Sequence, residues 1–378
     1  MAKIRFLLIV FPIFFTACKD HITDSNILKM ALSSKNPNIK RVMDSVERYE
    51  IQIRYTQIDR KDDSVSFSDY DFQVDKNNYF YPASTIKFPI AVLALERLNA
   101  VDSLNRNTNY YIEGDSIETT FAKDISQIFA ISDNGANNRL MEFLGQDTIN
   151  SKLHRKGIEP VRISHRVGYH TDDLMTKPLI IYLNDSTTAP TQPTQNTAAI
   201  PLKIDNLEKG TGFYDDGSLV HEPFDFGLKN YYPVTAQHAL LKRIIFPEKF
   251  RPSERFNLSR EQHDFLLETM HTLPKNIGYD AIEYYDGYCK FFLFGDTKGP
   301  IPDHIEIYNK TGSAYGTLTD CAYIKDEKNN VDFFLTATIL VNKNGIFNDN
   351  LYEYDTVGMP FLAELGREIH KLEMNRKK

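Results

Sequence analysis

Tryptophan is absent from the 378 residues of this chain, and cysteine occurs only three times. The 21 tyrosines and 25 phenylalanines must therefore supply the aromatic part of a core and of any cleft walls. Two of the cysteines, Cys289 and Cys321, would be able to pair in an exported protein. Cys321, however, falls on a predicted core strand. Because buried free cysteine is common in cores, we expect two free thiols.

Clustered positive charge is also missing. The formal net charge is −7 and the isoelectric point is near 5.8, which argues against a nucleic-acid partner. The histidines, among them His165 and His170, lack a zinc-ligand spacing with a cysteine or carboxylate partner. Gly210 and Gly212 have no third glycine in register, which excludes a dinucleotide-binding loop. We therefore expect neither a metal nor a cofactor.

A long apolar run is missing at the N-terminus, since residues 7–15 are too few to span a bilayer as a permanent helix. This short run follows Lys3 and Arg5 and ends in small residues before Cys18. The pattern is typical of a bacterial lipoprotein signal, which is cleaved before Cys18 so that the cysteine sulfur is acylated. An ordinary secretory signal with an incidental cysteine is the alternative interpretation.

These signals divide the chain into a signal peptide at 1–17, a polar tether at 18–35 and a folded domain at 36–378. An apolar content of 42% is sufficient for a packed core of that size. We expect an exported lipoprotein that is held to a membrane through its N-terminal lipid only, on the periplasmic side or at the cell surface. We also expect a monomer.

Hydrophobic periodicity predicts the structure at both ends of the domain. Apolar positions within 39–49 and within 362–372 recur at spacings of 3, 4 and 3, which is one face of an amphipathic helix. Residues 50–58 and 64–75 alternate imperfectly around a charged turn and predict a hairpin. Three further strands are expected, at 304–308, 318–324 and 331–341.

The simplest assembly of these elements is one antiparallel sheet of about five strands, with the terminal helices packed on one face. The middle of the chain, roughly 90–290, is expected to be mostly helical, so the fold class is α/β with an all-helical subdomain. Within it, about 171–232 is interpreted as an insertion. Its Thr- and Pro-rich part, 186–199, is too polar to build a core and is expected to be a mobile surface loop.

Three short elements carry the functional signal, and they stand in a fixed order. They are Ser84-Thr85-Ile86-Lys87, Ser132-Asp133-Asn134 and Lys310-Thr311-Gly312. Each of them is weak alone. Together they supply a nucleophile, a nearby amine, a second hydroxyl with an amide, and another cation. That is the equipment for acyl transfer through a serine ester.

Lys87 follows Ser84 by three positions, so a helix places both on one face and brings the amine toward the hydroxyl. Lysine acts as a base only when burial or nearby cations lower its pKa. The helix N-terminus adds positive potential at Ser84. The apolar run 90–95 predicts a helix buried through the centre of the molecule, and Pro89 is expected to perturb its second turn.

The other two elements would bind substrate and complete the reaction. Ser132 would relay a proton to the leaving nitrogen, and Asn134 would hydrogen-bond a side-chain amide of the substrate. The plainer interpretation of this second element is a helix cap. Lys310 and Thr311 would hold a carboxylate, and the charge of Lys310 also favours the neutral form of Lys87.

The order and local context of the elements resemble the active-site serine hydrolases that act on penicillin-like substrates, and the class A β-lactamase family above all. The run 310–322 is the most specific part of the match, and the similarity nearly vanishes across the insertion. Gly312 removes a side chain where a substrate must lie against the strand edge. The resemblance implies an oxyanion hole made by the backbone N–H groups of Ser84 and Ser313.

One part of that family's machinery is missing from its expected place. Class A β-lactamases carry a deacylating glutamate with an asparagine four residues later, and Val167 falls where this glutamate is expected. No glutamate between 150 and 290 has an asparagine four residues on. Glu222 is the remaining candidate for the deacylating base, although Phe226 occupies the asparagine position. A solvated loop carboxylate is the plainer interpretation of Glu222.

Three functions therefore stay open. The first is β-lactam hydrolysis through a serine acyl-enzyme, and the ordered elements favour it. The second is a D,D-carboxypeptidase or transpeptidase that acts on D-Ala-D-Ala stem peptides, which the missing glutamate motivates. The third is a non-catalytic surface-binding lipoprotein, which the insertion and the tether motivate.

Overall fold

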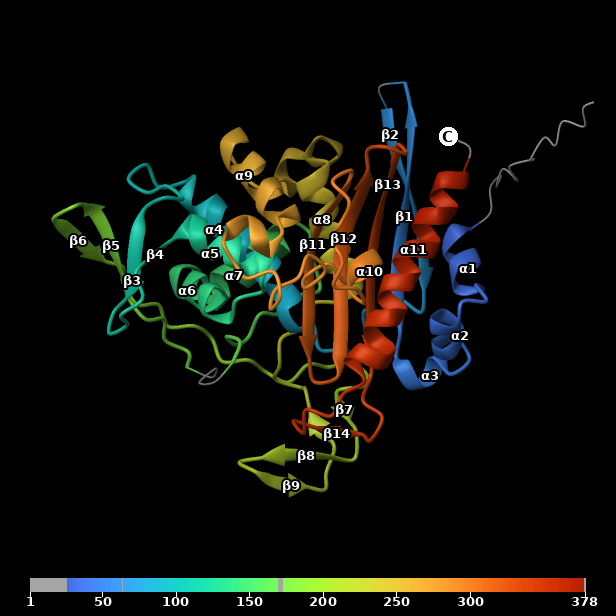
Figure 1. The fold of residues 1–378 in the computed structure, drawn as a ribbon. Helices are drawn as coiled ribbons and strands as arrows, with labels where there is room; N and C mark the ends of the chain where they lie inside the picture. The colour runs from blue at the N-terminus through green and yellow to red at the C-terminus, as the bar shows by residue number, and fades with distance from the viewer. Residues whose placement is uncertain (1–25, 63, 169–172, 377–378) are drawn as a thin grey trace, which may run out of the picture.

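The computed structural model describes residues 26–62, 64–168 and 173–376. Its centre is a five-stranded antiparallel sheet in the order β11-β12-β13-β1-β2, as the sequence predicted (Figure 1). The strands are β1 (Gln52–Lys61), β2 (Ser64–Phe72), β11 (Ile305–Ala314), β12 (Thr317–Asp326) and β13 (Val331–Leu340). Cys18, His170 and the predicted signal peptide lie outside the described residues. In the segments that are described, no helix combines the length and the apolar character needed to cross a bilayer.

The burial of the strands follows their place in the sheet. β12 and β13 are buried along almost their whole length, whereas the edge strand β2 alternates between half-buried and exposed positions. Central strands become continuously apolar when both faces of a sheet are covered by helices. Cys321 lies on β12, and both it and Cys289 are buried free thiols, as expected.

The terminal helices cover one face of the sheet, also as predicted (Figure 1). The long helix α11 (Met359–Asn375) packs there beside the N-terminal helices, and its apolar positions join those of β1, β12 and β13 in one core. The short helices on this face are α1 (Ile27–Leu32), α2 (Pro37–Met43), α3 (Val46–Tyr49) and α10 (Phe291–Phe294).

Two predictions at the N-terminal end need correction. Residues 39–49 form two helices, because Ser45 leaves the helical region at φ −140° between α2 and α3. The predicted tether at 18–35 ends early, because Ile27, Leu28 and Ala31 are buried in α1, which contacts α11. A helix of six residues is too short to display a hydrophobic period, which explains why the sequence did not reveal it.

A group of helices covers the other face of the sheet. α8 (Val234–Ile245) contacts β1, β12 and β13 directly. The central helix α4 (Lys87–Leu98) is buried on all sides, as its apolar run predicted. Pro89 does not perturb it, because it is the third residue of α4, where a helix leaves N–H groups unpaired anyway. Around α4 lie α5 (Phe121–Ala130), α6 (Asn134–Leu144), α7 (Gln146–Arg155) and α9 (Arg260–His271).

The middle of the chain is less helical than expected, because three small sheets are built into it. Even the Thr-rich part of the insertion contributes a strand, Thr187–Pro190, which pairs with Leu179–Asn184, and Asn196 is buried. β-Branched threonine favours extended backbone, so this polar segment adds a strand without adding to a core. The strands are β3 (Asn109–Ile112), β4 (Thr119–Thr120), β5 (Leu179–Asn184), β6 (Thr187–Pro190), β7 (Glu208–Lys209), β8 (Gly212–Asp215), β9 (Ser218–Val220), β10 (Phe224–Asp225) and β14 (Ile346–Phe347).

Candidate active site

Ser84 lies in a short 3-10 helix, η1 (Ala83–Ile86), which leads directly into α4. The residues of α4 from Ile90 to Leu95 are completely buried, so this helix is fixed in the core on all sides. Ser84 itself stays half-buried and lines a pocket. The serine therefore stands at the N-terminal end of a helix that is buried on all sides.

Lys87 begins α4 and its side chain is fully buried. Its Nζ donates hydrogen bonds to the carbonyl oxygen of Ser132, to Asn134 Oδ1 at 2.6 Å and to Ser132 Oγ at 3.3 Å. Burial holds the pKa of the Lys87 amine well below its ordinary value, and the nearby charge of Lys310 lowers it further. An amine in this environment gives up its proton readily and is suited to act as a base.

Ser132 joins the two lysines. Its hydroxyl accepts a hydrogen bond from Lys310 Nζ at 2.8 Å, in addition to the longer one from Lys87. Its backbone has a φ of +59°, a left-handed conformation that costs a non-glycine residue on the order of 1 kcal/mol. The next residue, Asp133, caps α6 by accepting a hydrogen bond from the backbone N–H of Ala136 at 2.6 Å. The cap and the hydroxyl position predicted for this element therefore occur together.

Lys310 lies on β11 and is buried, with Nζ also donating to the carbonyl oxygen of Thr311 at 2.7 Å. Burial lowers the pKa of Lys310 to about 8, against the opposing influence of Cys289 and Asp320. A neutral or charged state is thus accessible near physiological pH. Thr311 is buried beside it.

A polar network behind β11 supports this strand. Lys290 is fully buried and donates to Asn309 Oδ1 at 2.7 Å and to the carbonyl oxygens of Met270 and Ile307. Asn309 in turn donates to Asp320 Oδ1 at 2.8 Å. Burial lowers the pKa of Lys290 to about 8 and raises that of Asp320 to about 6. Three charged or amide groups thus fix the backbone immediately before Lys310.

Gly312 has a packing role in addition to the substrate approach predicted for it. A Cβ atom at this position would lie 2.8 Å from the carbonyl oxygen of Pro82 and 2.9 Å from the backbone nitrogen of Ser84. Real Cβ atoms do not approach backbone atoms so closely. Gly312 therefore lets β11, the strand that carries Lys310, pack directly against η1, the helix that carries Ser84.

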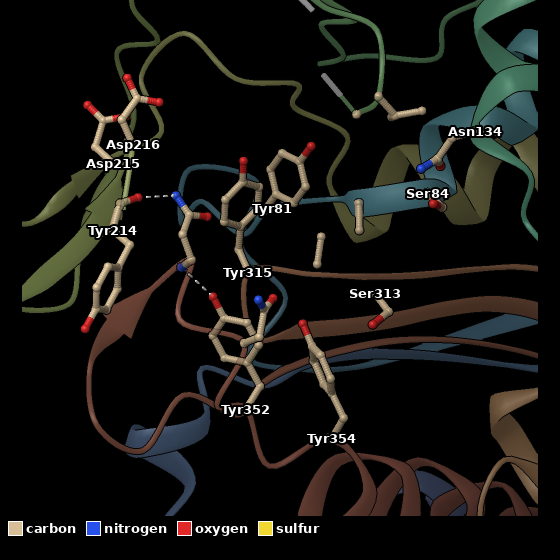
Figure 2. A pocket seen from close by; sticks show the side chains of 16 residues that line it. Tyr81, Ser84, Asn134, Tyr214, Asp215, Asp216, Ser313, Tyr315, Tyr352 and Tyr354 are labelled. Carbon is tan, nitrogen blue, oxygen red and sulfur yellow. Dashed lines mark hydrogen bonds between the residues drawn. The ribbon is translucent and has the colours of Figure 1, made fainter. Parts of the chain in front are cut away.

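Ser84, Asn134 and Ser313 line a common pocket with a volume of about 720 Å³ (Figure 2). The structure thus brings together Lys87, Ser132, Asn134 and Lys310 in one hydrogen-bonded group beside the pocket that holds the two serines. Much of the remaining lining is aromatic: Tyr81, Tyr214, Tyr315, Tyr352 and Tyr354. The high tyrosine content was the only sequence signal for these walls.

Val167, which falls at the sequence position expected for the missing glutamate, lines the same pocket. Asn138 holds its backbone on both sides, because Asn138 Nδ2 donates to the Val167 carbonyl at 2.8 Å and Oδ1 accepts from its N–H at 3.0 Å. Glu222 is exposed on the segment between β9 and β10 and is not among the described residues that line the pocket. The structure therefore gives Glu222 no position from which to act as a base on Ser84. Within the described ranges, no group of three or more metal-ligating side chains converges.

The site and the fold together resemble those of the serine β-lactamases. Residues 36–200 match the model of the β-lactamase enzyme family. A β-lactamase from Sphaerobacter thermophilus DSM 20745 has the same fold, with a TM-score of 0.52, 12% identity, and coverage of 92% of this chain and 95% of that chain. A class A β-lactamase from Mycobacterium abscessus has a TM-score of 0.50 and 15% identity, with coverage of 89% of this chain and 98% of that chain. A β-lactamase from Burkholderia ambifaria has a TM-score of 0.50 and 15% identity, with coverage of 86% of this chain and 95% of that chain.

No curated protein matches the chain by sequence. At 12% to 15% identity the similarity to solved structures establishes the fold. With the family match, it confirms the resemblance drawn from the three motifs. The fold is that of the β-lactamases, and residues 36–200 carry the sequence similarity to the β-lactamase enzyme family.

Proposed function

We propose that the protein hydrolyses β-lactams through a serine acyl-enzyme. The observation that supports this most is the Ser132 hydroxyl, which lies between the amines of Lys87 and Lys310 next to the pocket of Ser84. A neutral amine at Lys87, a cation at Lys310 and a hydroxyl beside one end of a pocket suit a substrate that carries a carboxylate beside its reacting amide.

In the proposed reaction, the Ser84 oxygen attacks the strained amide carbonyl and Lys87, in its neutral form, takes the proton of the hydroxyl. Ser132 delivers a proton to the leaving nitrogen as the C–N bond breaks, and Lys87 restores that proton. Lys310 and Thr311 hold the substrate carboxylate. Water then cleaves the ester, and the proton it gives up restores the Ser84 hydroxyl.

Two further groups complete the proposed site. Asn134 would hydrogen-bond the side-chain amide of the substrate. The backbone N–H groups of Ser84 and Ser313 would form the oxyanion hole, in which each donor is worth about 3 kcal/mol of barrier lowering.

The test is turnover of a chromogenic cephalosporin, with intact-mass detection of the acyl-enzyme. We expect wild type to turn over and Ser84→Ala to lose both turnover and adduct. Ser186→Ala, an exposed serine in the β5–β6 turn, is the matched control and should behave as wild type. Absence of both turnover and adduct on wild type would contradict the proposal and favour a non-catalytic binding protein.

A second candidate function is a D,D-carboxypeptidase or transpeptidase acting on D-Ala-D-Ala peptides. The observation that favours it is Val167, an apolar side chain at the pocket position where a deacylating glutamate is expected. Without such a base the β-lactam ester should hydrolyse slowly. Long-lived labelling by a fluorescent penicillin, together with release of D-Ala from a pentapeptide, would favour this function over the first.

For the location, we propose an exported lipoprotein that is acylated at Cys18. Metabolic labelling with a radioactive fatty acid should mark wild type and spare Cys18→Ala. If Cys18→Ala is labelled as strongly as wild type, the lipid is elsewhere. We propose a monomer, for which light scattering during gel filtration should give a mass near that of one chain, 43.6 kDa before processing.

A further inference from the structure

The pocket extends well beyond Ser84. At its far end it is lined by Tyr214, Asp215 and Asp216 from the β8–β9 hairpin of the insertion, and by residues that follow β14 (Figure 2). In Figure 2 the two aspartates stand on the side of the pocket away from Ser84. Tyr81 and Tyr315 lie between the aspartates and Ser84. The residues that follow β14 in this lining are Asn348, Asn350, Tyr352 and Tyr354.

The far end is attached to the rest of the fold. β8 pairs in parallel with β14, and Asn348 Nδ2 donates to the carbonyl oxygen of Tyr214 at 3.1 Å. Asn348 also donates its backbone N–H to the Tyr352 hydroxyl at 2.9 Å. A Cβ atom on Gly210 would lie 2.3 Å from the carbonyl oxygen of Gly345, so only glycine permits this approach. The insertion is therefore docked as a wall of the pocket.

The two ends of the pocket differ in charge. The cationic Lys310 lies beside the end at Ser84, whereas Asp215 and Asp216 are the charged residues of the far end. Within the described ranges, neither aspartate makes a side-chain hydrogen bond or an ion pair, and the described lining contains no lysine, arginine or histidine. Both aspartates are exposed, so their negative charge is accessible to a ligand that enters the pocket.

Aromatic rings lead from one end to the other. The rings of Tyr81 and Tyr315 meet edge to face with centroids 4.9 Å apart, and those of Tyr352 and Tyr354 are 5.3 Å apart. Such walls pack against a methylene chain, and a ring face attracts a cation. Asn134 lines the same pocket and, in the proposed mechanism, receives the substrate's side-chain amide. The side chain of the substrate is therefore the part that enters this pocket.

We propose that the far end is a specificity site for a cationic amine on the substrate side chain, remote from the amide that reacts. This inference rests on the proposed acylation of Ser84. It assigns to the insertion the selection of extended substrates that carry a carboxylate at one end and an ammonium group at the other. Asp215 and Asp216 bind the ammonium group, and the tyrosines hold the chain that carries it.

The test compares two cephalosporins of the same length, one with an aminoalkyl side chain and one in which that amine is N-acetylated. The readout is the second-order rate constant for acylation of Ser84, followed by intact mass, because this step does not depend on deacylation. Two solvent-exposed ion pairs and a cation–π contact together should make wild type react about tenfold faster with the ammonium probe. High salt should reduce this ratio.

In the double variant Asp215→Asn/Asp216→Asn the ratio should fall close to one, while the rate with the acetylated probe stays as in wild type. Asparagine tolerates the positive φ of Asp216, so the turn should persist. The control Asp102→Asn/Asp185→Asn removes two exposed carboxylates that do not line the pocket and should keep the wild-type ratio. A ratio near one in wild type, or an unchanged ratio in the pocket variant, would overturn this inference and leave the proposed function intact. Neither turnover nor adduct with either probe would overturn the proposed function and the inference with it.

Discussion

Raising the pH above 8 should slow the acylation of this protein by carboxylated β-lactams, because Lys310 then loses its charge. Burial lowers the pKa of Lys310 to about 8, which is below the ordinary range for lysine. The ammonium form is therefore present below pH 8 and disappears above it. Only that form can pair with the substrate carboxylate, so binding should weaken as the pH rises through this value.

The size of the effect follows from the same pKa. With a pKa of about 8, roughly 90% of Lys310 is charged at about pH 7 and roughly 10% at about pH 9. The second-order rate constant for acylation should therefore fall about ninefold over that interval. The pKa of Lys87 is lowered well below its ordinary value, so the base becomes neutral as the pH rises and gives the opposite slope at lower pH. Together the two amines predict a bell-shaped profile.

The assay is stopped-flow acylation from about pH 6 to about pH 10 with a chromogenic cephalosporin and with its methyl ester. The ester carries no charge, so its profile should lack the decline above pH 8. Lys310→Arg keeps the cation at all these pH values and should remove the decline for the acid as well. Since arginine is larger, its absolute rate is expected to be lower, and the shape of the profile is the relevant result.

Lys290 provides the strongest competing explanation, because burial lowers its pKa to about 8 too. It contacts β11 through Asn309, so its titration would act on the strand and would affect both probes alike. A decline of equal depth for the acid and the ester, or one that persists in Lys310→Arg, would refute the role given to Lys310.

Three further predictions test the packing and the missing base. Gly312→Ala should slow acylation on the order of 100-fold, because its Cβ would push β11 away from the nucleophilic serine, whereas Gly299→Ala on the surface should not; equal rates would contradict the contact. Ile27→Ala should lower the free energy of unfolding by about 2–4 kcal/mol in denaturant titrations, and Lys29→Ala, at an exposed position, should lower it by much less. If Ile27→Ala leaves the free energy of unfolding unchanged, the tether interpretation is restored. Val167→Glu should shorten the acyl-enzyme lifetime on the order of 100-fold by intact mass, and Val167→Gln should not.

The sheet and its terminal helices were predictable because their signals are periodic. The apolar stripes of α11 and of the strands record which face each element buries, and antiparallel pairing of consecutive strands needs little else. The error at Ile27–Leu32 arose because a short helix gains its stability from the surface on which it packs. The small sheets of the insertion are held by a few backbone pairs, such as those between β8 and β14, which leave no period in the sequence.

The candidate catalytic group was predictable for a different reason. Ser84, Lys87, Ser132 and Lys310 were found by residue type and order, because acyl transfer requires those groups whatever surrounds them. Their surroundings were not predictable in the same way. The reason for Gly312 became clear only from the approach of the Ser84 backbone, and the far end of the pocket brings together residues more than 100 positions apart in the chain.

The rate of deacylation distinguishes the two candidate functions, and Val167 is the residue at which it can be changed. Asn138 binds the backbone of Val167 through both of its amide atoms, so the loop conformation does not depend on the side chain that Val167 carries. A glutamate there would face the same pocket as Ser84. If it shortens the life of the ester, wild type lacks only the base, and the site is built for an acyl-enzyme that waits for a second substrate, as a peptidase requires. If the ester of wild type is already short-lived, another group supplies the water, and β-lactam hydrolysis is the activity that the site serves.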